Sequence, residues 1–150
     1  MHIAFACDSA ASVLKEELIA HAESLGHTCH DCGIQPEEPN DYPLYGARAS
    51  RLVQSGACDL GVVLCGTGVG MSLAANKHQG IRCAVCSESY TAAMARAHNN
   101  ANMLAMGARV IGSELAKLVL ETFLSTPFEG GRHQRRIDMI AAIEKEGSIF

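Results

Sequence analysis

The residues that could carry chemistry are concentrated in one short stretch, Leu64-Cys65-Gly66-Thr67-Gly68-Val69-Gly70-Met71-Ser72. A cysteine there ends an aliphatic run, and three alternating glycines lead into a segment that is compatible with a helix. Glycines let the backbone turn tightly and bring its N–H groups close to a ligand, and the positive end of the helix dipole favours negative charge at the same place. Because this field also favours a thiolate, Cys65 is a candidate base or nucleophile.

A second candidate group lies near the C-terminus, where three arginines and a histidine follow a double glycine between Phe128 and Arg136. Guanidinium groups bind phosphate oxygens in forked pairs, so this segment is suited to a phosphate. The helix dipole disfavours positive charge at the start of a helix. The presence of arginines there therefore favours a ligand-binding role for them. A solvated helix start is the plain alternative.

Bulk composition limits the classes of protein to which the chain can belong. With 150 residues, of which 48% are hydrophobic and 19% charged, the chain can bury a substantial core as one domain. A formal charge of −4 and a pI near 5.9 argue against general nucleic-acid binding. No apolar run approaches the roughly 20 residues of a membrane span, and the N-terminus lacks the pattern of a secretion signal. We therefore expect a cytoplasmic protein with neither a membrane nor a nucleic-acid partner.

The seven cysteines are interpreted as reduced thiols, because their number is odd and several lie inside apolar runs. Two C-x-x-C pairs, Cys29/Cys32 and Cys83/Cys86, have the spacing of a four-cysteine zinc site. Residues three apart on a strand point to opposite faces, so the sulfurs of the second pair would not converge on one metal. A redox role for the first pair is disfavoured, because that pair lies in or at the end of an expected strand.

Strand-like and helix-like runs alternate along the chain, which is typical of βαβ units and predicts a Rossmann-like α/β/α sandwich with a five-stranded parallel sheet. We expect strands at 3–6, 27–31, 60–64, 82–85 and 103–107. Helices are expected at 11–25, 45–55, 69–76, 89–97, 113–125 and near 133–146. A loop rich in proline and acidic residues, 33–45, is well placed to border a site.

Several ordered motifs along nearly the whole chain resemble the type B ribose-5-phosphate isomerases, which are related to the galactose-6-phosphate isomerase subunits. They are Cys7-Asp8 with Leu14-Lys15, Asp41-Tyr42-Pro43, Cys65 to Gly70, Ala74 to Lys77 with Gly80-Ile81-Arg82, Ala97-His98-Asn99, Gly107 to Val110, and Gly130 to His133. The resemblance implies metal-independent interconversion of aldose and ketose phosphates without a cofactor. It also implies a homodimer, or a tetramer of two such dimers, with composite active sites at the interface.

The resemblance assigns roles to individual residues. Cys65 resembles the base that moves a proton between C1 and C2 through an enediolate, with Thr67 beside it, and His98 resembles the residue that opens the sugar ring. Backbone groups would hold the oxyanion, arginines the phosphate, and other side chains the hydroxyls or the wall; these substrate-binding residues are Asp8, Ser9, Tyr42, Gly66, Gly68, Val69, Gly70, Asn99, Arg109, Arg132, His133 and Arg136. The alternative, purely structural roles are a helix cap for Asp8 and an exposed position at the end of a helix for His98.

Two departures from the family pattern bear on the substrate. Ser9 stands where the family usually has a histidine near the phosphate, and Asn100 stands where it often has an aspartate. The distance from C1 to the phosphate decides which donors reach it, so tetrose and hexose phosphates are alternatives to a pentose phosphate. A non-catalytic nucleotide-binding module is a further alternative, although the glycine spacing matches neither a P-loop nor a dinucleotide fingerprint.

Overall fold

The computed structural model describes residues 1–34 and 37–149 and contains one parallel sheet. Its five strands run in the order β2-β1-β3-β5-β4, and all four neighbouring pairs are parallel. The strand bounds are β1 His2–Cys7, β2 Thr28–Asp31, β3 Leu60–Cys65, β4 Cys83–Val85 and β5 Met103–Gly107.

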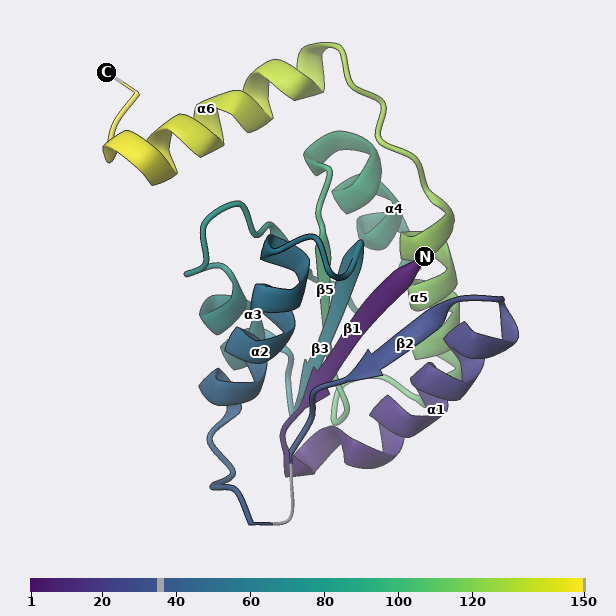
Figure 1. The fold of residues 1–150 in the computed structure, drawn as a ribbon. Coiled ribbons are helices and arrows are strands. Elements are labelled where there is room, and N and C mark those ends of the chain that lie inside the picture. The colour runs from purple at the N-terminus through teal and green to yellow at the C-terminus, as the bar shows by residue number, and fades with distance from the viewer. Residues whose placement is uncertain (35–36, 150) are drawn as a thin grey trace.

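Helices cover both faces of this sheet (Figure 1). They are α1 Ser12–Ser24, α2 Tyr42–Gln54, α3 Val69–Ala75, α4 Ser89–Asn99, α5 Ser113–Ser125 and α6 Arg132–Glu146. On one face the residues of α1, α4 and α5 pack against alternate strand residues such as Phe5, Val62 and Leu104. On the other, α2 and α3 pack against the intervening residues, such as Ala6 and Val63. This period of two confirms the predicted three-layer α/β/α sandwich.

The order of the strands places the topological switch point of the sheet between β1 and β3. From β1 the chain moves to one edge through β2, and β3 then pairs with the other side of β1. In open parallel sheets, ligands bind beyond the carboxyl ends of the strands at such a switch point. Asp8 follows β1 and Cys65 ends β3, so both residues lie at this switch point.

The expected elements are all present, and the differences lie at their ends. The helix predicted at 45–55 starts three residues earlier, because Pro43 occupies its first turn, where a missing N–H costs nothing. The helix predicted at 11–25 is preceded by a 3₁₀ turn, Ser9–Ala11, which is capped by the Asp8 carboxylate accepting from the Ala10 N–H at 3.0 Å. Asp8 therefore caps this short turn and not the predicted helix, since α1 begins after Ala11 without a side-chain cap hydrogen bond.

The two C-x-x-C pairs do not form metal sites or disulfides. All seven cysteines are free thiols. Cys83 packs against the core under α2 and α3, whereas Cys86 packs against the core on the opposite face of the sheet. Cys29 and Cys32 are divided between the two faces in the same way. The strand-parity argument against a four-cysteine zinc site is thus confirmed.

Parts of two other expectations are met. Within the described residues, no helix is both long and apolar enough to cross a membrane. The loop 33–45 does reach the turn that follows β1, since the side chain of Asn40 accepts a hydrogen bond from the Ser9 N–H at 2.9 Å. Gln35 and Pro36 of that loop lie outside the described residues.

Two backbone segments come unusually close where β3 and β5 end. A Cβ at Gly68 would lie 2.9 Å from the carbonyl carbon of Met106, and a Cβ at Gly107 would lie 2.7 Å from the carbonyl carbon of Thr67. Gly68 also has φ +81°, in the left-handed region that favours glycine. Both glycines are needed for the loop after β3 to pack against the end of β5.

Gly107→Ala is expected to destabilise the protein by about 3 kcal/mol, because the new methyl group meets backbone that cannot rotate away. Urea denaturation, with the midpoint compared at constant slope, measures this cost. Gly112→Ala is the matched control: a Cβ there meets nothing within 4 Å and φ is −77°, so the loss should be about 1 kcal/mol or less. Equal losses in the two variants would contradict the close approach.

Candidate functional site

Cys65 lies at the carboxyl end of β3 with its sulfur turned into the glycine loop. Its Sγ accepts a hydrogen bond from the Gly68 N–H at 3.1 Å, and the residue keeps 6% of its surface exposed. A hydrogen bond donated to sulfur stabilises negative charge on it. The hydroxyl of Thr67 accepts a hydrogen bond from the Val69 N–H at 3.4 Å. The thiol of Cys65 is therefore bonded to Gly68 and not to the Thr67 hydroxyl. The role of Thr67 in orienting the thiol stays a prediction.

The other predicted residues at this edge surround the loop. The exposed Arg109 lies over Gly66, where a Cβ would be 3.5 Å from Nη1, and the Arg109 N–H donates to the Gly66 carbonyl at 3.0 Å. The ring of Tyr42 lies against Gly70, where a Cβ would be 2.8 Å from Cζ. Together with Asp8 and Ser9 at the end of β1, these side chains place one cation, one ring and several polar groups around Cys65.

A second set of predicted residues gathers where α4 ends and α6 begins. The imidazole rings of His98 and His133 stack with centroids 4.2 Å apart and planes 5° from parallel. His133 is buried, whereas His98 keeps 36% of its side chain exposed. Arg132 and Arg136 are exposed on the first turns of α6, and Asn99 is exposed at the end of α4. This set combines an imidazole pair with two guanidinium groups.

Burial is the main cause that lowers the pKa of His133 from its ordinary value, and the neighbouring His98 and Arg132 lower it further. Glu129 acts in the opposite direction. The ring of His133 is therefore held in its neutral form more firmly than that of an ordinary histidine.

The two sets lie at opposite edges of the sheet. Cys65 pairs in register with Gly107 at the carboxyl ends of β3 and β5. The turn that follows His98 returns to the amino ends, where the Asn102 carbonyl accepts from the Gly61 N–H at 3.0 Å. The four residue steps of strand between these edges span about 13 Å. In Figure 1, α6 accordingly lies beyond the edge from which β1 starts. One copy of the chain therefore does not bring Cys65 and His98 together.

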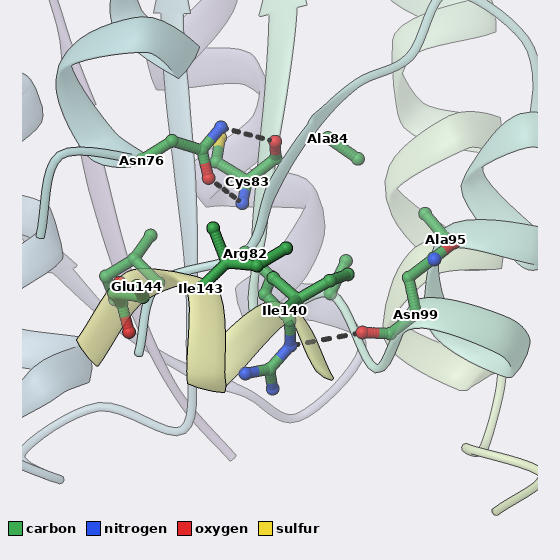
Figure 2. Close-up of a pocket in the computed structure, with 11 residues that line it drawn as sticks. Asn76, Arg82, Cys83, Ala84, Ala95, Asn99, Ile140, Ile143 and Glu144 are labelled. Atoms are coloured by element: carbon green, nitrogen blue, oxygen red, sulfur yellow. Dashed lines mark hydrogen bonds between the residues drawn. The ribbon is translucent and has the colours of Figure 1, made fainter. Parts of the chain in front are cut away.

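A pocket of about 510 Å³ opens between α6 and the sheet, away from Cys65. Figure 2 shows its wall, where Ile140 and Ile143 of α6 face Arg82 and Cys83. Asn99 borders it and accepts a hydrogen bond from Arg82 Nε through its backbone carbonyl at 3.1 Å. The exposed fractions of Ile140 and Ile143 are both 47%, so the face of α6 that looks into the pocket is only half covered.

Within residues 1–34 and 37–149, one group of side chains has the composition of a metal site. Ligand atoms of His98, Glu129 and His133 lie within 4.8 Å of one another. The lone pair of an imidazole nitrogen lies in the ring plane, so two parallel stacked rings do not direct their lone pairs to a common point. Two guanidinium groups stand beside the cluster as well. The geometry therefore does not favour a cation.

The remaining thiols are poor candidates for chemistry. Burial raises the pKa of Cys7, Cys32 and Cys86 to about 11 and that of Cys83 to about 12. Each of these sulfurs is held as a neutral thiol near pH 7, and a neutral thiol is neither a base nor a strong nucleophile.

Sequence reasoning missed two residues that contact the predicted sites. Asn40 bonds to the backbone of Ser9 from the proline-rich loop, and Glu129 lies beside both histidines. Glu129 lies four residues before His133, a spacing that brings side chains together on a helix. The double glycine between the two residues argues against a helix there, so the spacing did not indicate a contact. Asn100 also has a structural reason: it ends α4 at φ +43°, a left-handed conformation that asparagine tolerates better than most residues.

The chain is similar to known proteins over nearly its whole length. The family model described as Ribose/Galactose Isomerase matches residues 3–140. The chain is 48% identical over 143 residues to Ribose-5-phosphate isomerase B of Escherichia coli (strain K12), with 95% of this chain and 96% of that protein covered. It is 39% identical over 147 residues to D-erythrulose-4-phosphate isomerase of Pectobacterium atrosepticum, with 97% of each covered.

A solved structure of Clostridium thermocellum Ribose-5-Phosphate Isomerase B superposes with a TM-score of 0.94 at 45% identity, covering 99% of this chain and 100% of that one. The match extends over every element that positions the two sets of predicted residues. The resemblance inferred from the ordered motifs is thereby confirmed, and the chain belongs to the ribose/galactose isomerase family.

Proposed function

We propose that this protein is an aldose–ketose isomerase that interconverts ribose 5-phosphate and ribulose 5-phosphate through an enediolate. The observation that carries the proposal is the placement of the Cys65 sulfur, which lies at the carboxyl edge of the sheet and accepts the Gly68 N–H. Membership of the isomerase family and the similarity to proteins named ribose-5-phosphate isomerase B support the substrate. The same family membership disfavours a non-catalytic nucleotide-binding module.

The chemistry follows from what the reaction requires. The Cys65 thiolate removes the proton from C2 of the open-chain aldose, the C1=C2 bond forms, and the carbonyl electrons move to O1. Backbone N–H groups between Gly66 and Gly70 stabilise the charge on O1, while Thr67 orients the sulfur. The proton is returned to C1, and the O2 proton passes to O1, which completes the ketose. Charge thus develops where the loop offers donors.

The remaining predicted residues hold the substrate. Arg109 over Gly66 and the pair Arg132 and Arg136 are the proposed phosphate ligands, because a guanidinium offers two parallel donors to phosphate oxygens. Asp8 and Asn99 bind hydroxyl groups, and Tyr42, Ser9, Val69 and His133 form the wall. His98 opens the sugar ring. These assignments draw on both edges of the sheet.

We infer that the working enzyme is a homodimer, or a tetramer of two such dimers, in which each site takes Cys65 from one protomer and His98 from its partner. The supporting observation is the separation of the two sets by the length of β3 and β5. Exposed apolar residues offer a surface for the second copy, namely Val69 and Leu73 on α3 and Met139, Ile140 and Ile143 on α6. A two-fold arrangement would complete two sites at once. Residues 1–150 would then act as one domain, with α6 in the contact.

Replacing Cys65 with alanine tests the base. Cys65→Ala should lower kcat on ribose 5-phosphate by about 10²- to 10⁴-fold, because proton abstraction loses its acceptor. A coupled assay measures the rate, and circular dichroism checks the fold. Cys86→Ala is the matched control: it also removes a buried thiol after a strand but should keep kcat nearly unchanged. Full activity in Cys65→Ala would rule out the assignment.

Sugar length is tested by comparing kcat/KM for erythrose 4-phosphate, ribose 5-phosphate and allose 6-phosphate. We expect the pentose phosphate to give the highest value. A tetrose phosphate is the second candidate, because Ser9 is short and its N–H is held by Asn40, and because one relative is named for a tetrose phosphate. A higher value for either other sugar would reassign the substrate while leaving the mechanism in place.

The composite site is tested by mixing two inactive variants. Cys65→Ala and His98→Asn each spoil both sites of a homodimer, but a dimer with one copy of each retains one intact site. Unfolding and refolding an equal mixture should therefore restore about a quarter of the unmodified activity. Each variant refolded alone is the control. An inactive mixture that has formed mixed dimers, as judged by mass spectrometry of differently tagged chains, would contradict the arrangement.

A further inference from the structure

Glu129 is the one acidic side chain near the stacked histidines, among the residues that the structure describes, and it contacts both of them. Its Oε2 atom lies 3.4 Å from Nε2 of His133 and 3.8 Å from Nε2 of His98. A single carboxylate oxygen therefore faces the same nitrogen of two parallel rings. The proposed function gives His98 a proton-transfer role and leaves Glu129 without one.

The backbone holds Glu129 in this position from both sides. Its N–H donates to the carbonyl of Ala97 at 3.0 Å, directly before His98 in α4. Gly130 and Gly131 follow with φ +65° and +56°, in the left-handed region, and no atom lies within 4 Å of a Cβ at either position. Their role is thus conformational: they turn the chain so that the first turn of α6 brings His133 next to Glu129. The carboxylate is placed by main chain, although its side chain is 55% exposed.

His133 carries an unsatisfied polar atom that points to the same carboxylate. Its side chain is only 6% exposed, and its Nε2 has no hydrogen-bond partner. Leaving a buried ring nitrogen unpaired costs about 1–3 kcal/mol, so a movement of a few tenths of an ångström that pairs it with Glu129 is favourable. Glu129 is then bonded to the buried ring, and the exposed ring of His98 stacks on that ring with its Nε2 3.8 Å from the same carboxylate oxygen.

The residue that ends α4, directly after Asn99, offers no carboxylate to His98. Position 100 is an asparagine, and Arg96 Nη1 donates to its Oδ1 at 3.1 Å. The side chain of Asn100 is therefore engaged with α4. A negative charge that orients His98 has to come from another segment, and Glu129 is placed to supply it.

We propose that Glu129 is a positioning residue for sugar-ring opening, an inference that rests on the proposed function. Its carboxylate accepts the Nε2–H of His98 and so leaves the lone pair on Nδ1. Nδ1 takes the proton of the anomeric hydroxyl, and the freed electrons form the C1=O1 double bond. The C1–O4 bond breaks, its electron pair stays on O4, and O4 receives the proton back from Nδ1. The protein gains and loses no proton overall.

Turnover of ribose 5-phosphate and hydrogen exchange at C1 of ribulose 5-phosphate together distinguish ring opening from proton transfer at carbon. Ribose 5-phosphate is a furanose that must open before C2 can lose its proton. Ribulose 5-phosphate is always open, because the oxygen that would close its ring carries the phosphate. Deuterium uptake at C1 of ribulose 5-phosphate in D₂O, followed by NMR, therefore reports the enediolate step alone.

Glu129→Gln should lower kcat/KM for ribose 5-phosphate by about 10- to 100-fold, because the amide no longer fixes the tautomer of His98. Deuterium uptake at C1 should change by less than about twofold. His98→Asn should give the same pattern with a larger loss. Glu121→Gln is the matched control, because it breaks a similar contact, 2.6 Å between Glu121 Oε1 and His21 Nε2, away from both sets of site residues.

The two measurements distinguish the possible failures. An unchanged kcat/KM in Glu129→Gln, or an equal loss in turnover and in C1 exchange, would overturn the positioning role. The unmodified protein has to catalyse both reactions. If it catalysed neither, the proposed function itself would fail.

Discussion

The close approach of two backbones at the ends of β3 and β5 is the constraint on which the site depends. Gly68 lies against Met106 and Gly107 lies against Thr67, at distances that no Cβ would tolerate. This packing sets the path of the loop, so that the Gly68 N–H points back at the Cys65 sulfur. The loop is thus preorganised by contacts outside the reaction, and little rearrangement is needed when negative charge develops.

The sheet also dictates a division of labour. A parallel strand carries its two ends to opposite edges, and a crossover helix returns the chain to the edge where the next strand starts. Groups at the end of a strand and groups at the end of a helix are therefore separated within one copy, as Cys65 and His98 are. In the proposed mechanism, proton abstraction from carbon uses the edge that carries Cys65, and opening of the ring uses the edge that carries His98. A second copy is the simplest way to reunite them.

Much of this fold follows from local sequence patterns. Buried parallel strands form aliphatic runs such as Leu60–Cys65, and the amphipathic helices between them have a clear period, so their existence and order could be predicted. The ends of the elements were harder to predict where a single residue fixes them, as Pro43 does in the first turn of α2. The loop from Gly66 to Gly70 and His98 could be selected as candidates because each lies in a motif of consecutive residues.

Contacts between distant segments could not be predicted in this way. The pairing of Glu129 with two histidines depends on two glycines in left-handed conformations, and a sequence pattern does not reveal their dihedral angles. The hydrogen bond from Ser9 to Asn40 joins the turn after β1 to a loop 31 residues away. The separation of Cys65 from His98 required the register of the strands, since motifs alone placed both in one site.

The central claim is that the Cys65 sulfur meets the substrate as a thiolate. Alkylation by iodoacetamide, with the modified cysteine identified by mass spectrometry and activity followed in parallel, tests this most directly. We predict that activity is lost in step with modification of Cys65, that ribose 5-phosphate slows both, and that Cys7, Cys83 and Cys86 remain unmodified meanwhile, because burial raises their pKa values to about 11–12. Complete modification of Cys65 with activity retained would contradict the account.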